Sequence, residues 1–569
     1  MSQYTPFDLE SLFEQHFFSN LDYFFAGSMA KAFKENDPIV LASCALVSKI
    51  LFEGHICLDI KAMSGTIRSV TQSCDDRVKF PDFDIWINAL QNSLMISDNI
   101  HPPLTPLVLD PDQRLYFSKY YDFQNRLIKN IAQRVLLKTL IMDEAAIETL
   151  LESYFTGNDK HMTRQKRAVK NTLLNHFTII SGGPGTGKTF VTAIIKKIFI
   201  EYAKKYNLPV PKIICVAPTG KAASKMEQGS TIHSVLKPLK NSPGFYYNKN
   251  NPLLTDMVII DEASMIDISL LTRLLDAVPM EANVIILGDK YQLSSIQAGS
   301  VFSDICSVKG LSDHLFILEH NFRSKGKTGI ENLSKAINSN DDHFLEKILT
   351  SRQYPDVVFE TLLDNDTVST ILKKYILEGY KLFASSDTPE EALHYLDNFK
   401  ILCAHNSGEY GTLQINHVCE NILRSENNFD IEKKLFKKII MVNTNDYKKN
   451  LFNGETGIVF EKKEESTAFF ISLDNTIKQY RASDLPGFDT GFAITIHKSQ
   501  GSEFNTVLMV IPSQMSPVVT RQLLYTGVTR AKKSVIIVGN MEIIKAAMKM
   551  SVKRNSGITA LLEKEISIQ

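Results

Sequence analysis

The sequence has no excess of charge of either sign. Among 569 residues, Lys and Arg total 63 and Asp and Glu total 63. A chain without a global positive field cannot hold nucleic acid by overall charge, so any such contact must come from local patches. Hydrophobic residues at 44% and charged residues at 22% are ordinary for a folded globular protein. The length is enough for several domains.

Cysteine is scarce and is never paired in the sequence. The seven cysteines are scattered, with no CxxC pair. This argues against a zinc or iron–sulfur site and favours a reducing compartment. No apolar run approaches the roughly 20 residues that a membrane helix needs, and the N-terminus carries early acids in place of a basic signal region. We therefore expect a cytoplasmic protein that makes no use of a membrane.

The first hundred residues predict helices and contain no catalytic cluster. Residues 37–54 place apolar side chains at helical spacing and end at a glycine. The dense aromatic residues of this region either form the core of a small domain or build a docking surface for a partner. Four prolines in 101–121 predict a boundary and then a small hairpin. We assign 1–105 to an N-terminal helical docking domain and 106–160 to a hairpin and helical connector.

Beyond residue 176 short apolar strands alternate with helices. Near-continuous apolar strands of this kind indicate parallel sheets covered on both faces. We predict two α/β domains, at 161–327 and 328–569, with a small β-rich insert at about 438–490 in the second. The predicted strands lie at 177–182, 212–218, 257–263 and 283–289, and again at 400–405, 506–511 and 534–539.

The run GGPGTGKT at 182–189 fits the P-loop pattern, because it follows a predicted strand and opens a predicted helix. Glycines let backbone N–H groups wrap a triphosphate, and the helix N-terminus adds a positive dipole. Lys188 is expected to reach the β- and γ-phosphates, and Thr189 to ligate Mg²⁺. The alternative is a glycine-rich turn without a ligand. The expected nucleotide-binding residues are Gly183, Pro184, Gly185, Thr186, Gly187, Lys188 and Thr189.

Two further groups of polar residues follow or precede predicted strands of the same sheet. In VIIDEAS (258–264), Asp261 suits Mg²⁺ and Glu262 suits a base that orients the attacking water, since buried acids need a cation. In GDKYQL (288–293), Gln292 is a candidate γ-phosphate contact, although alone it could be a solvated loop residue. Upstream, the amide of Gln165 can both donate to and accept from an adenine edge.

The ordered motifs resemble superfamily 1 DNA helicases, and within them the RecD family. The run NDYKKNLFNGETGIV (445–459) and the run GHICLDI (54–60) resemble RecD rather than the UvrD type. The resemblance covers roughly residues 35–540, and the first hundred residues match only loosely. The motifs that carry it are Gln165, GGPGTGKT, APTGKAA (217–223), STIHSVL (230–236), VIIDEAS, GDKYQLSSIQAG (288–299), LEHNFRS (318–324), AITIHKSQGSEF (493–504) and LLYTGVTRAKK (523–533).

This resemblance implies a fold and a place for ATP. The family has two RecA-like P-loop domains with ATP in the cleft between them, and the β-rich insert would be SH3-like. Arg530 would reach from the second domain to the γ-phosphate, and Arg323, at the junction of the domains, resembles a second such arginine. Such arginines stabilise transition-state charge and hold the cleft closed while the γ-phosphate is present. Glu503 resembles the family's ribose-contacting acid.

The resemblance also implies contacts with single-stranded DNA. Sequence-independent contact with phosphates suits a motor that moves along DNA. A lone histidine is more often structural, so the two histidines in this set depend on the resemblance. The residues that resemble the family's phosphate and sugar contacts are Thr219, Gly220, Thr231, His233, Thr495, His497, Lys498 and Ser499.

RecD resemblance implies ATP-driven 5′→3′ movement on single-stranded DNA and work at duplex ends. It also implies a RecC-like scaffold and a RecB-like helicase–nuclease as partners. Nothing resembles the family's nuclease motifs, so we expect no DNA cleavage by this chain. The alternatives are a stand-alone RecD-like helicase, which usually has a longer N-terminal region, and a P-loop switch or scaffold that binds without moving. Arg323, Arg530 and the HKSQGSEF loop argue against the switch.

Overall fold

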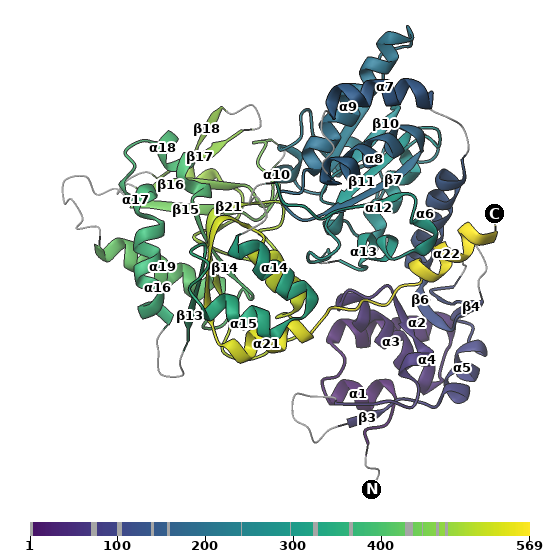
Figure 1. Cartoon of the computed structure of the whole chain (residues 1–569). Helices are drawn as coiled ribbons and strands as arrows, with labels where there is room; N and C mark the ends of the chain where they lie inside the picture. The colour runs from purple at the N-terminus through teal and green to yellow at the C-terminus, as the bar shows by residue number, and fades with distance from the viewer. Residues whose placement is uncertain are drawn as a thin grey trace.

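The structure, a computed structural model, describes residues 4–69, 77–98, 105–137, 142–155, 160–240, 242–295, 297–322, 328–362, 368–426, 436–446, 448–461, 466–472 and 476–568. Two α/β domains lie side by side, and the N-terminal region lies below the first of them (Figure 1). The C-terminal segment passes the N-terminal region, and the last helix then lies beside the first α/β domain, apart from the N-terminus (Figure 1).

The N-terminal region begins with helices. The predicted helix at 37–54 is confirmed as α3, which spans Pro38–Phe52. Asp37 starts it, because its carboxylate accepts the backbone N–H groups of Ile39 and Val40 and proline fits the first turn. The helices of this region are α1 (Leu9–Glu14), α2 (Asn20–Phe33), α3, α4 (Ile60–Met63) and α5 (Phe83–Gln91).

Short strands cross the predicted boundary near residue 105. The predicted hairpin is confirmed as antiparallel β5 (Leu107–Leu109) and β6 (Arg114–Phe117). These strands continue a sheet of order β1-β6-β5-β4, with β1 at Cys57–Asp59 and β4 at Ile96–Asp98. The region therefore mixes helix and strand where the sequence predicted helices, because strands of three residues are too short to show a period of two. A separate ribbon pairs β2 (Ile67–Ser69) with β3 (Arg77–Lys79).

The first α/β domain has a parallel sheet of order β12-β7-β11-β10-β8-β9. All the strands predicted here are confirmed. The strands are β7 (Phe177–Gly182), β8 (Ile213–Ala217), β9 (Ser230–Thr231), β10 (Met257–Ile260), β11 (Asn283–Gly288) and β12 (Leu315–Leu318). The helices are α6 (Ser118–Leu136), α7 (Glu144–Tyr154), α8 (Lys160–Leu174), α9 (Lys188–Lys205), α10 (Gly220–Ala223), α11 (Ile232–Leu236), α12 (Ile268–Ala277) and α13 (Val301–Cys306), with single turns at Ala263–Met265 and Lys309–Leu311.

The register of this sheet brings three strand ends to one edge. Val258 of β10 lies opposite Ile214 of β8 and Val284 of β11, so these strands run level. Gly182, Ile260 and Gly288 end β7, β10 and β11. Because the carboxyl ends of parallel strands share one edge, the residues that follow each of them come together there.

The second α/β domain has a parallel sheet of order β13-β22-β21-β14-β20. The strands predicted at 400–405, 506–511 and 534–539 are confirmed within it. The strands are β13 (Val357–Thr361), β14 (Phe399–Cys403), β20 (Ala493–Thr495), β21 (Phe504–Val510) and β22 (Ala531–Gly539). The helices are α14 (Gly329–Ser339), α15 (Asp342–Thr350), α16 (Val368–Gly379), α17 (Lys381–Ser385), α18 (Pro389–His394), α19 (Thr412–Glu426), α20 (Arg521–Val528) and α21 (Met541–Lys549), with a single turn at Tyr395–Asp397.

An antiparallel sheet stands at the predicted β-rich insert. Its order is β18-β17-β16-β15-β19, and β19 joins it by pairing with β15, where Asp489 lies opposite Met441. The SH3-like character of this insert stays a prediction. The strands are β15 (Phe436–Val442), β16 (Thr456–Glu461), β17 (Thr467–Ile471), β18 (Ile477–Arg481) and β19 (Phe488–Thr490), with a single turn at Ala482–Asp484.

The C-terminal segment crosses from the second α/β domain to the first, which the sequence did not predict. It leaves α21, runs past the N-terminal region, and ends in α22 (Ile558–Ile568) beside α6 (Figure 1). The Ile56 N–H donates to the Asn555 carbonyl over 2.9 Å, and the Gly557 N–H donates to Gln124 Oε1 over 2.9 Å. Residues 550–568 therefore join three parts of the fold, and we call them the C-terminal strap.

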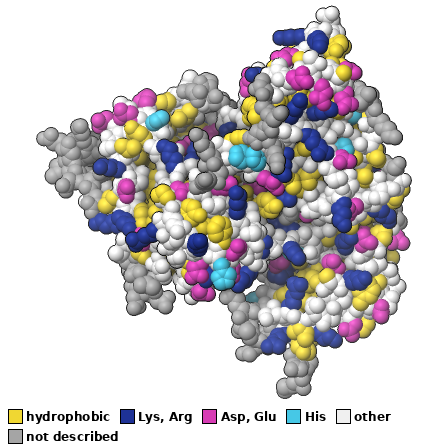
Figure 2. Space-filling model, viewed as in Figure 1, with side chains coloured by type: hydrophobic (Ala, Val, Ile, Leu, Met, Phe, Trp, Pro, Cys, Tyr) yellow, Lys and Arg dark blue, Asp and Glu magenta, His cyan; other side chains and the backbone are white. Residues whose placement is uncertain are grey.

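Surface charges of both signs are mixed over the face shown in Figure 2, in agreement with the balanced composition. Among the described residues, every helix is too short or too polar to cross a bilayer.

Candidate functional site

The P-loop joins β7 to α9 with left-handed backbone at Gly185 and Gly187, whose φ angles are 80° and 90°. A side chain at Gly182 would meet Thr186 Oγ1 at 2.5 Å and the Leu318 carbonyl at 2.8 Å, so only glycine fits there. The ammonium of Lys188 donates to the carbonyls of Gly182 and Gly183, the latter over 3.2 Å. Lys188 thus lies inside the P-loop to which the sequence assigned it.

Two carboxylates stand at the end of β10. Asp261 is half-buried. Its desolvation, with the neighbouring Glu262 charge, raises its pKa, whereas Lys188 acts in the opposite direction. Glu262 has φ of 51°, a left-handed conformation that side chains other than glycine rarely adopt. Strain of this kind is typical of functional sites and costs about 1–3 kcal/mol. The structure brings both acids to the edge of the sheet that carries the P-loop.

The loop after β11 supplies a third polar group. Asp289 is buried and accepts a hydrogen bond from Gln292 Nε2 over 3.1 Å. It also accepts one from the Tyr525 hydroxyl of the second domain over 2.9 Å. Gln292 Oε1 is buried and has no hydrogen-bond partner among the described residues. Gln292 therefore contacts Asp289, and it is the Asp289 carboxylate that lies beside Gly183 of the P-loop.

Arg530 lies between α20 and β22 and is 1% exposed. It donates from Nε to the Thr526 carbonyl over 3.3 Å and from Nη1 to the Ser502 carbonyl over 3.1 Å. Its Nη2 is buried without a hydrogen-bond partner among the described residues. An unpaired charged donor is costly, so this arginine suits an anion.

Glu503 and Arg323 are the other two residues predicted near the domain junction. Glu503, at the start of β21, lies 3.9 Å from the ammonium of Lys532, and its side chain is mostly buried. Arg323 lies outside the described residues.

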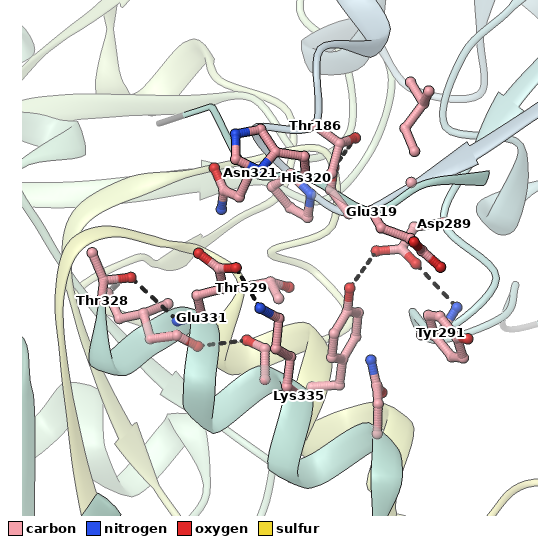
Figure 3. Close-up of a pocket in the computed structure, with 18 of the residues that line it drawn as sticks. Thr186, Asp289, Tyr291, Glu319, His320, Asn321, Thr328, Glu331, Lys335 and Thr529 are labelled. Atoms are coloured by element: carbon pink, nitrogen blue, oxygen red, sulfur yellow. Dashed lines mark hydrogen bonds and ion pairs between the residues drawn. The ribbon is translucent and has the colours of Figure 1, made fainter. Parts of the chain in front are cut away.

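A cavity of about 810 Å³ separates the two domains at this edge. In Figure 3, Thr186, Asp289 and Tyr291 face Thr328, Glu331 and Lys335 of α14 across it. Lysines are placed around its wall, among them Lys290, Lys335, Lys532 and Lys533. A cavity between two domains, with several lysines and a P-loop on its wall, suits a polyanionic ligand.

An aromatic cluster stands at the other end of the P-loop. Gln165 is buried and donates to the Thr186 carbonyl over 3.3 Å, so it supports the loop in this structure. The Phe322 N–H donates to the Gly185 carbonyl over 3.0 Å, and its ring is 43% exposed. His320 lies 4.6 Å from that ring, edge to face. An exposed aromatic ring beside an amide suits a nucleobase.

The residues at this edge fit ATP with Mg²⁺. Backbone N–H groups, a lysine and a helix N-terminus suit a triphosphate, and the glycine-only space at Gly182 gives the phosphates a close backbone approach. The Thr189 hydroxyl and the Asp261 carboxylate are hard oxygen donors of the kind that Mg²⁺ prefers alongside phosphates. Within the described residues no cluster of three or more His, Cys, Asp or Glu is arranged to hold a metal by protein groups alone.

The predicted DNA contacts of the first domain lie at helix starts. Thr219 and Thr231 cap α10 and α11, since their hydroxyls accept the N–H groups of Ala222 and Ser234 over 3.2 Å each. Gly220 faces open space on its Cβ side. His233 is exposed and lies 5.8 Å from the Phe245 ring.

In the second domain the predicted contacts follow β20. Thr495 and Lys498 line a cavity of about 380 Å³ between α19 and the insert. Lys498 also pairs with Asp489 over 3.0 Å. Burial lowers the pKa of His497, with a smaller effect of Arg554. Ser499 is fully buried and donates to the Ile496 carbonyl over 2.7 Å, so it holds the turn and does not reach the surface.

Sequence reasoning missed Phe322 and Tyr525. Both stand inside quoted motifs, LEHNFRS and LLYTGVTRAKK, but neither was assigned a role. The exposed ring of Phe322 and the contact of Tyr525 with the first domain depend on residues far away in the chain. For Phe322 the only local signal is its place next to Arg323, and for Tyr525 it is membership of the motif that carries Arg530.

Comparisons with known families agree with this arrangement. Residues 14–116 match the family "RecBCD enzyme subunit RecD, N-terminal domain". Residues 165–298 match an AAA domain, and residues 490–538 match the UvrD-like helicase C-terminal domain.

Curated relatives extend the likeness over nearly the whole chain. The RecBCD enzyme subunit RecD of Mycolicibacterium smegmatis is 28% identical over 550 residues, which cover 92% of this chain and 94% of the relative. That of Haemophilus influenzae is 27% identical over 650 residues, covering 98% and 99%. The chain is RecD-like over nearly its whole length.

Other likenesses of this RecD-like chain are partial. The ATP-dependent RecD2 DNA helicase of Deinococcus radiodurans is 28% identical over 414 residues, which cover 71% of this chain but only 52% of that protein. Among solved structures, Pif1 helicase from Bacteroides in complex with ADP-AlF3 and single-stranded DNA matches with TM-score 0.39 and 17% identity, over 75% of this chain and 97% of that one. A TM-score of this size supports no conclusion about individual helices or strands.

Proposed function

We propose that the chain is an ATP-dependent 5′→3′ DNA helicase that works as the RecD-like subunit of a RecBCD-type helicase–nuclease in double-strand break repair and recombination. The observation that carries the proposal is the cavity between the two α/β domains. The P-loop stands on its first-domain side, and the segment that carries Arg530 contributes Thr529, Lys532 and Lys533 on the other. The acids Asp261 and Glu262 follow β10 at the same edge of the first-domain sheet. The two domains correspond to the RecA-like pair of the family.

Each predicted residue then has a role in hydrolysis. Lys188 and the P-loop bind the phosphates, and Thr189 and Asp261 hold Mg²⁺, which supplies charge neutralisation when bound. Glu262 orients the attacking water, and we assign Gln292, in the loop after β11, to the γ-phosphate. The free N–H of Arg530 supports a role in stabilising transition-state charge.

We assign single-stranded DNA to the surface that runs over α10, α11 and the turn after β20. Thr219, Gly220, Thr231 and His233 contribute from the first domain, and Thr495, His497 and Lys498 from the second. Short polar side chains at helix starts suit phosphate contact without sequence choice. Ser499 supports this surface by holding its turn.

RecB-like and RecC-like chains are the partners that we propose, and we place DNA cleavage in the partner. The names of the curated relatives support this assignment. On the N-terminal region, Leu21, Phe24 and Phe52 expose more than half of their side chains. Exposed apolar residues on α2 and α3 support docking of a partner there.

The test is DNA-stimulated ATP hydrolysis together with directional movement by the full-length chain. We expect hydrolysis to rise when single-stranded DNA is added, and streptavidin to be displaced faster from the 3′ end of an oligonucleotide than from the 5′ end. Faster displacement from 5′ ends would contradict the direction, and hydrolysis that ignores DNA would favour a P-loop switch. A stand-alone helicase, the second candidate, would unwind duplex ends at full rate without co-purifying partners.

A further inference from the structure

The Tyr525 hydroxyl lies where the second domain touches the P-loop. Tyr525 belongs to α20, is 5% exposed, and donates to Asp289 Oδ2 over 2.9 Å. A Cβ atom built on Gly183 would lie 2.9 Å from this hydroxyl and 3.7 Å from Asp289 Oδ2. The Tyr525 hydroxyl therefore joins the second domain to the first directly beside a glycine of the P-loop.

The surroundings fix the direction of this hydrogen bond. Asp289 Oδ2 also accepts from Gln292 Nε2 over 3.1 Å, and Oδ1 accepts the Tyr291 N–H over 3.1 Å. Burial, and after it the Asp289 carboxylate, raises the pKa of Tyr525 well above its ordinary value. The phenol therefore keeps its proton and remains the donor.

Thr526, the residue after Tyr525, makes a second hydrogen bond between the two domains. The Leu293 N–H donates to Thr526 Oγ1 over 2.9 Å, so the loop after β11 is bonded to two consecutive residues of α20. The Thr526 carbonyl in turn accepts from Arg530 Nε over 3.3 Å. A line of hydrogen bonds thus runs from Asp289, beside the P-loop, through one turn of helix to the guanidinium.

We propose that Tyr525 is a positioning residue for ATP hydrolysis, whose hydroxyl, held by Asp289 beside Gly183, sets the place of Arg530 relative to the P-loop. The inference rests on the proposed ATPase function. Tyr525 acts through Arg530. Its hydroxyl donates a hydrogen bond to Asp289 but transfers no proton in the reaction and does not bind the metal. Loss of the hydroxyl leaves the ring packed in α20 but frees the turn that carries the arginine.

The first test replaces Tyr525→Phe in the full-length chain, which removes one oxygen atom. We expect kcat for DNA-stimulated ATP hydrolysis to fall by about ten-fold or more, the size expected for a lost hydrogen bond to a charged group. The Kd for a fluorescent ADP analogue should stay within about two-fold, because the interaction matters for the arginine and not for ground-state binding. Tyr375→Phe is the matched control, since the Tyr375 hydroxyl also donates to a carboxylate of the same domain, Glu360, far from the cavity.

The second test separates positioning from general structure. In an Arg530→Ala background, Tyr525→Phe should lower kcat by less than about two-fold, because the residue that it positions is already gone. Equal loss in both backgrounds, loss of ADP binding in parallel with kcat, or the same loss in Tyr375→Phe would overturn the role of Tyr525. Unchanged kcat in Tyr525→Phe would overturn it as well while leaving the ATPase in place. A wild-type chain without ATP hydrolysis would overturn the proposed function and this role together.

Discussion

Gln500 donates a hydrogen bond from Nε2 to the carbonyl oxygen of Leu293 over 2.7 Å, although 207 positions separate the two residues in the chain. Both are buried. Leu293 closes the loop that begins at Asp289, and Gln500 closes the turn that carries Lys498. The loop beside the nucleotide cavity and the loop proposed to touch DNA are therefore bonded directly to each other.

Gln500→Ala should weaken the contact between the two α/β domains. It leaves the buried Leu293 carbonyl without this partner, which costs about 1–3 kcal/mol. We expect a lower midpoint of thermal unfolding and faster proteolysis between the domains. Gln353→Ala, at an exposed position of the second domain, is the control and should leave both unchanged. A Gln500→Ala chain as stable as the wild type would show that this contact contributes little.

Lys188→Ala and Glu262→Gln should fail at different steps. Lys188→Ala removes the cation inside the P-loop, so nucleotide binding should weaken. Glu262→Gln keeps the shape of the side chain but removes the base, so ADP and ATP should bind while single-turnover hydrolysis slows by about 10²–10⁴-fold. Binding and single-turnover rates are measured separately. Glu281→Gln, at an exposed position of the same domain, should behave as the wild type. Wild-type hydrolysis by Glu262→Gln would remove Glu262 from the mechanism.

Local sequence patterns were sufficient for the central strands of the two parallel sheets and for the P-loop. The apolar runs of β7, β10 and β11 are buried on both faces, so composition alone identifies them. The acids at the end of β10 were predictable for the same reason, because a charge that ends a buried strand needs a cation.

Elements and contacts that depend on residues far away in the chain were not predictable from the sequence. β1 has three residues and gains its identity only by pairing with β6, so no period marks it in the sequence. The C-terminal strap shows a helical pattern, but nothing local says that it packs beside α6. Tyr525 lies in a recognised motif, yet its partner Asp289 is 236 positions away.

Lys498→Ala should weaken single-stranded DNA binding by the same factor for all sequences. Its side chain is 43% exposed on the surface proposed for DNA. Loss of one phosphate contact should reduce the slope of log affinity against log salt concentration by about 0.7. Titrations at several salt concentrations measure this slope, with Lys381→Ala, an exposed lysine of the same domain, as the control. A slope that stays the same would exclude Lys498 from phosphate contact.

Asp304→Asn should change how stability depends on pH. Burial raises the pKa of Asp304 from 3.8 to about 6, against smaller opposite effects of Ser556 and Arg554. The folded state therefore favours the neutral acid. Above about pH 4 this carboxyl ionises in the unfolded chain but stays neutral in the folded chain, so the free energy of unfolding of the wild type falls. The fall is complete above about pH 6. A difference of about 2 in pKa corresponds to about 3 kcal/mol at most.

Asparagine stays neutral and can still accept the Ser556 hydroxyl, which lies 2.7 Å from Asp304 Oδ2. The unfolding midpoint of Asp304→Asn should match the wild type near pH 3, below both pKa values, and exceed it at pH 7.5. Asp313→Asn, at an exposed position, should show no such divergence. Parallel pH profiles for Asp304→Asn and the wild type would contradict the burial penalty.

Arg554 should hold the C-terminal strap in place. Its Nη1 donates to the carbonyls of Ser295, Gln297 and Gly299 over 2.6, 3.0 and 3.1 Å. Arg554→Ala leaves those carbonyls without the charged donor, which costs about 1.5–3 kcal/mol. The unfolding midpoint should therefore fall by several degrees.

Arg554→Lys keeps the charge but has no planar guanidinium, so it should recover only part of the loss. Deletion of residues 551–569 should lower the midpoint further than Arg554→Ala, since it also exposes the apolar surface that α22 covers on α6. Thermal unfolding and limited proteolysis between α21 and α22 measure both effects, with Lys553→Ala, the exposed neighbour, as the control. If Arg554→Ala unfolds at the wild-type temperature while the deletion does not, α22 alone anchors the strap. If neither variant changes the midpoint, the strap lies on the molecule without stabilising it.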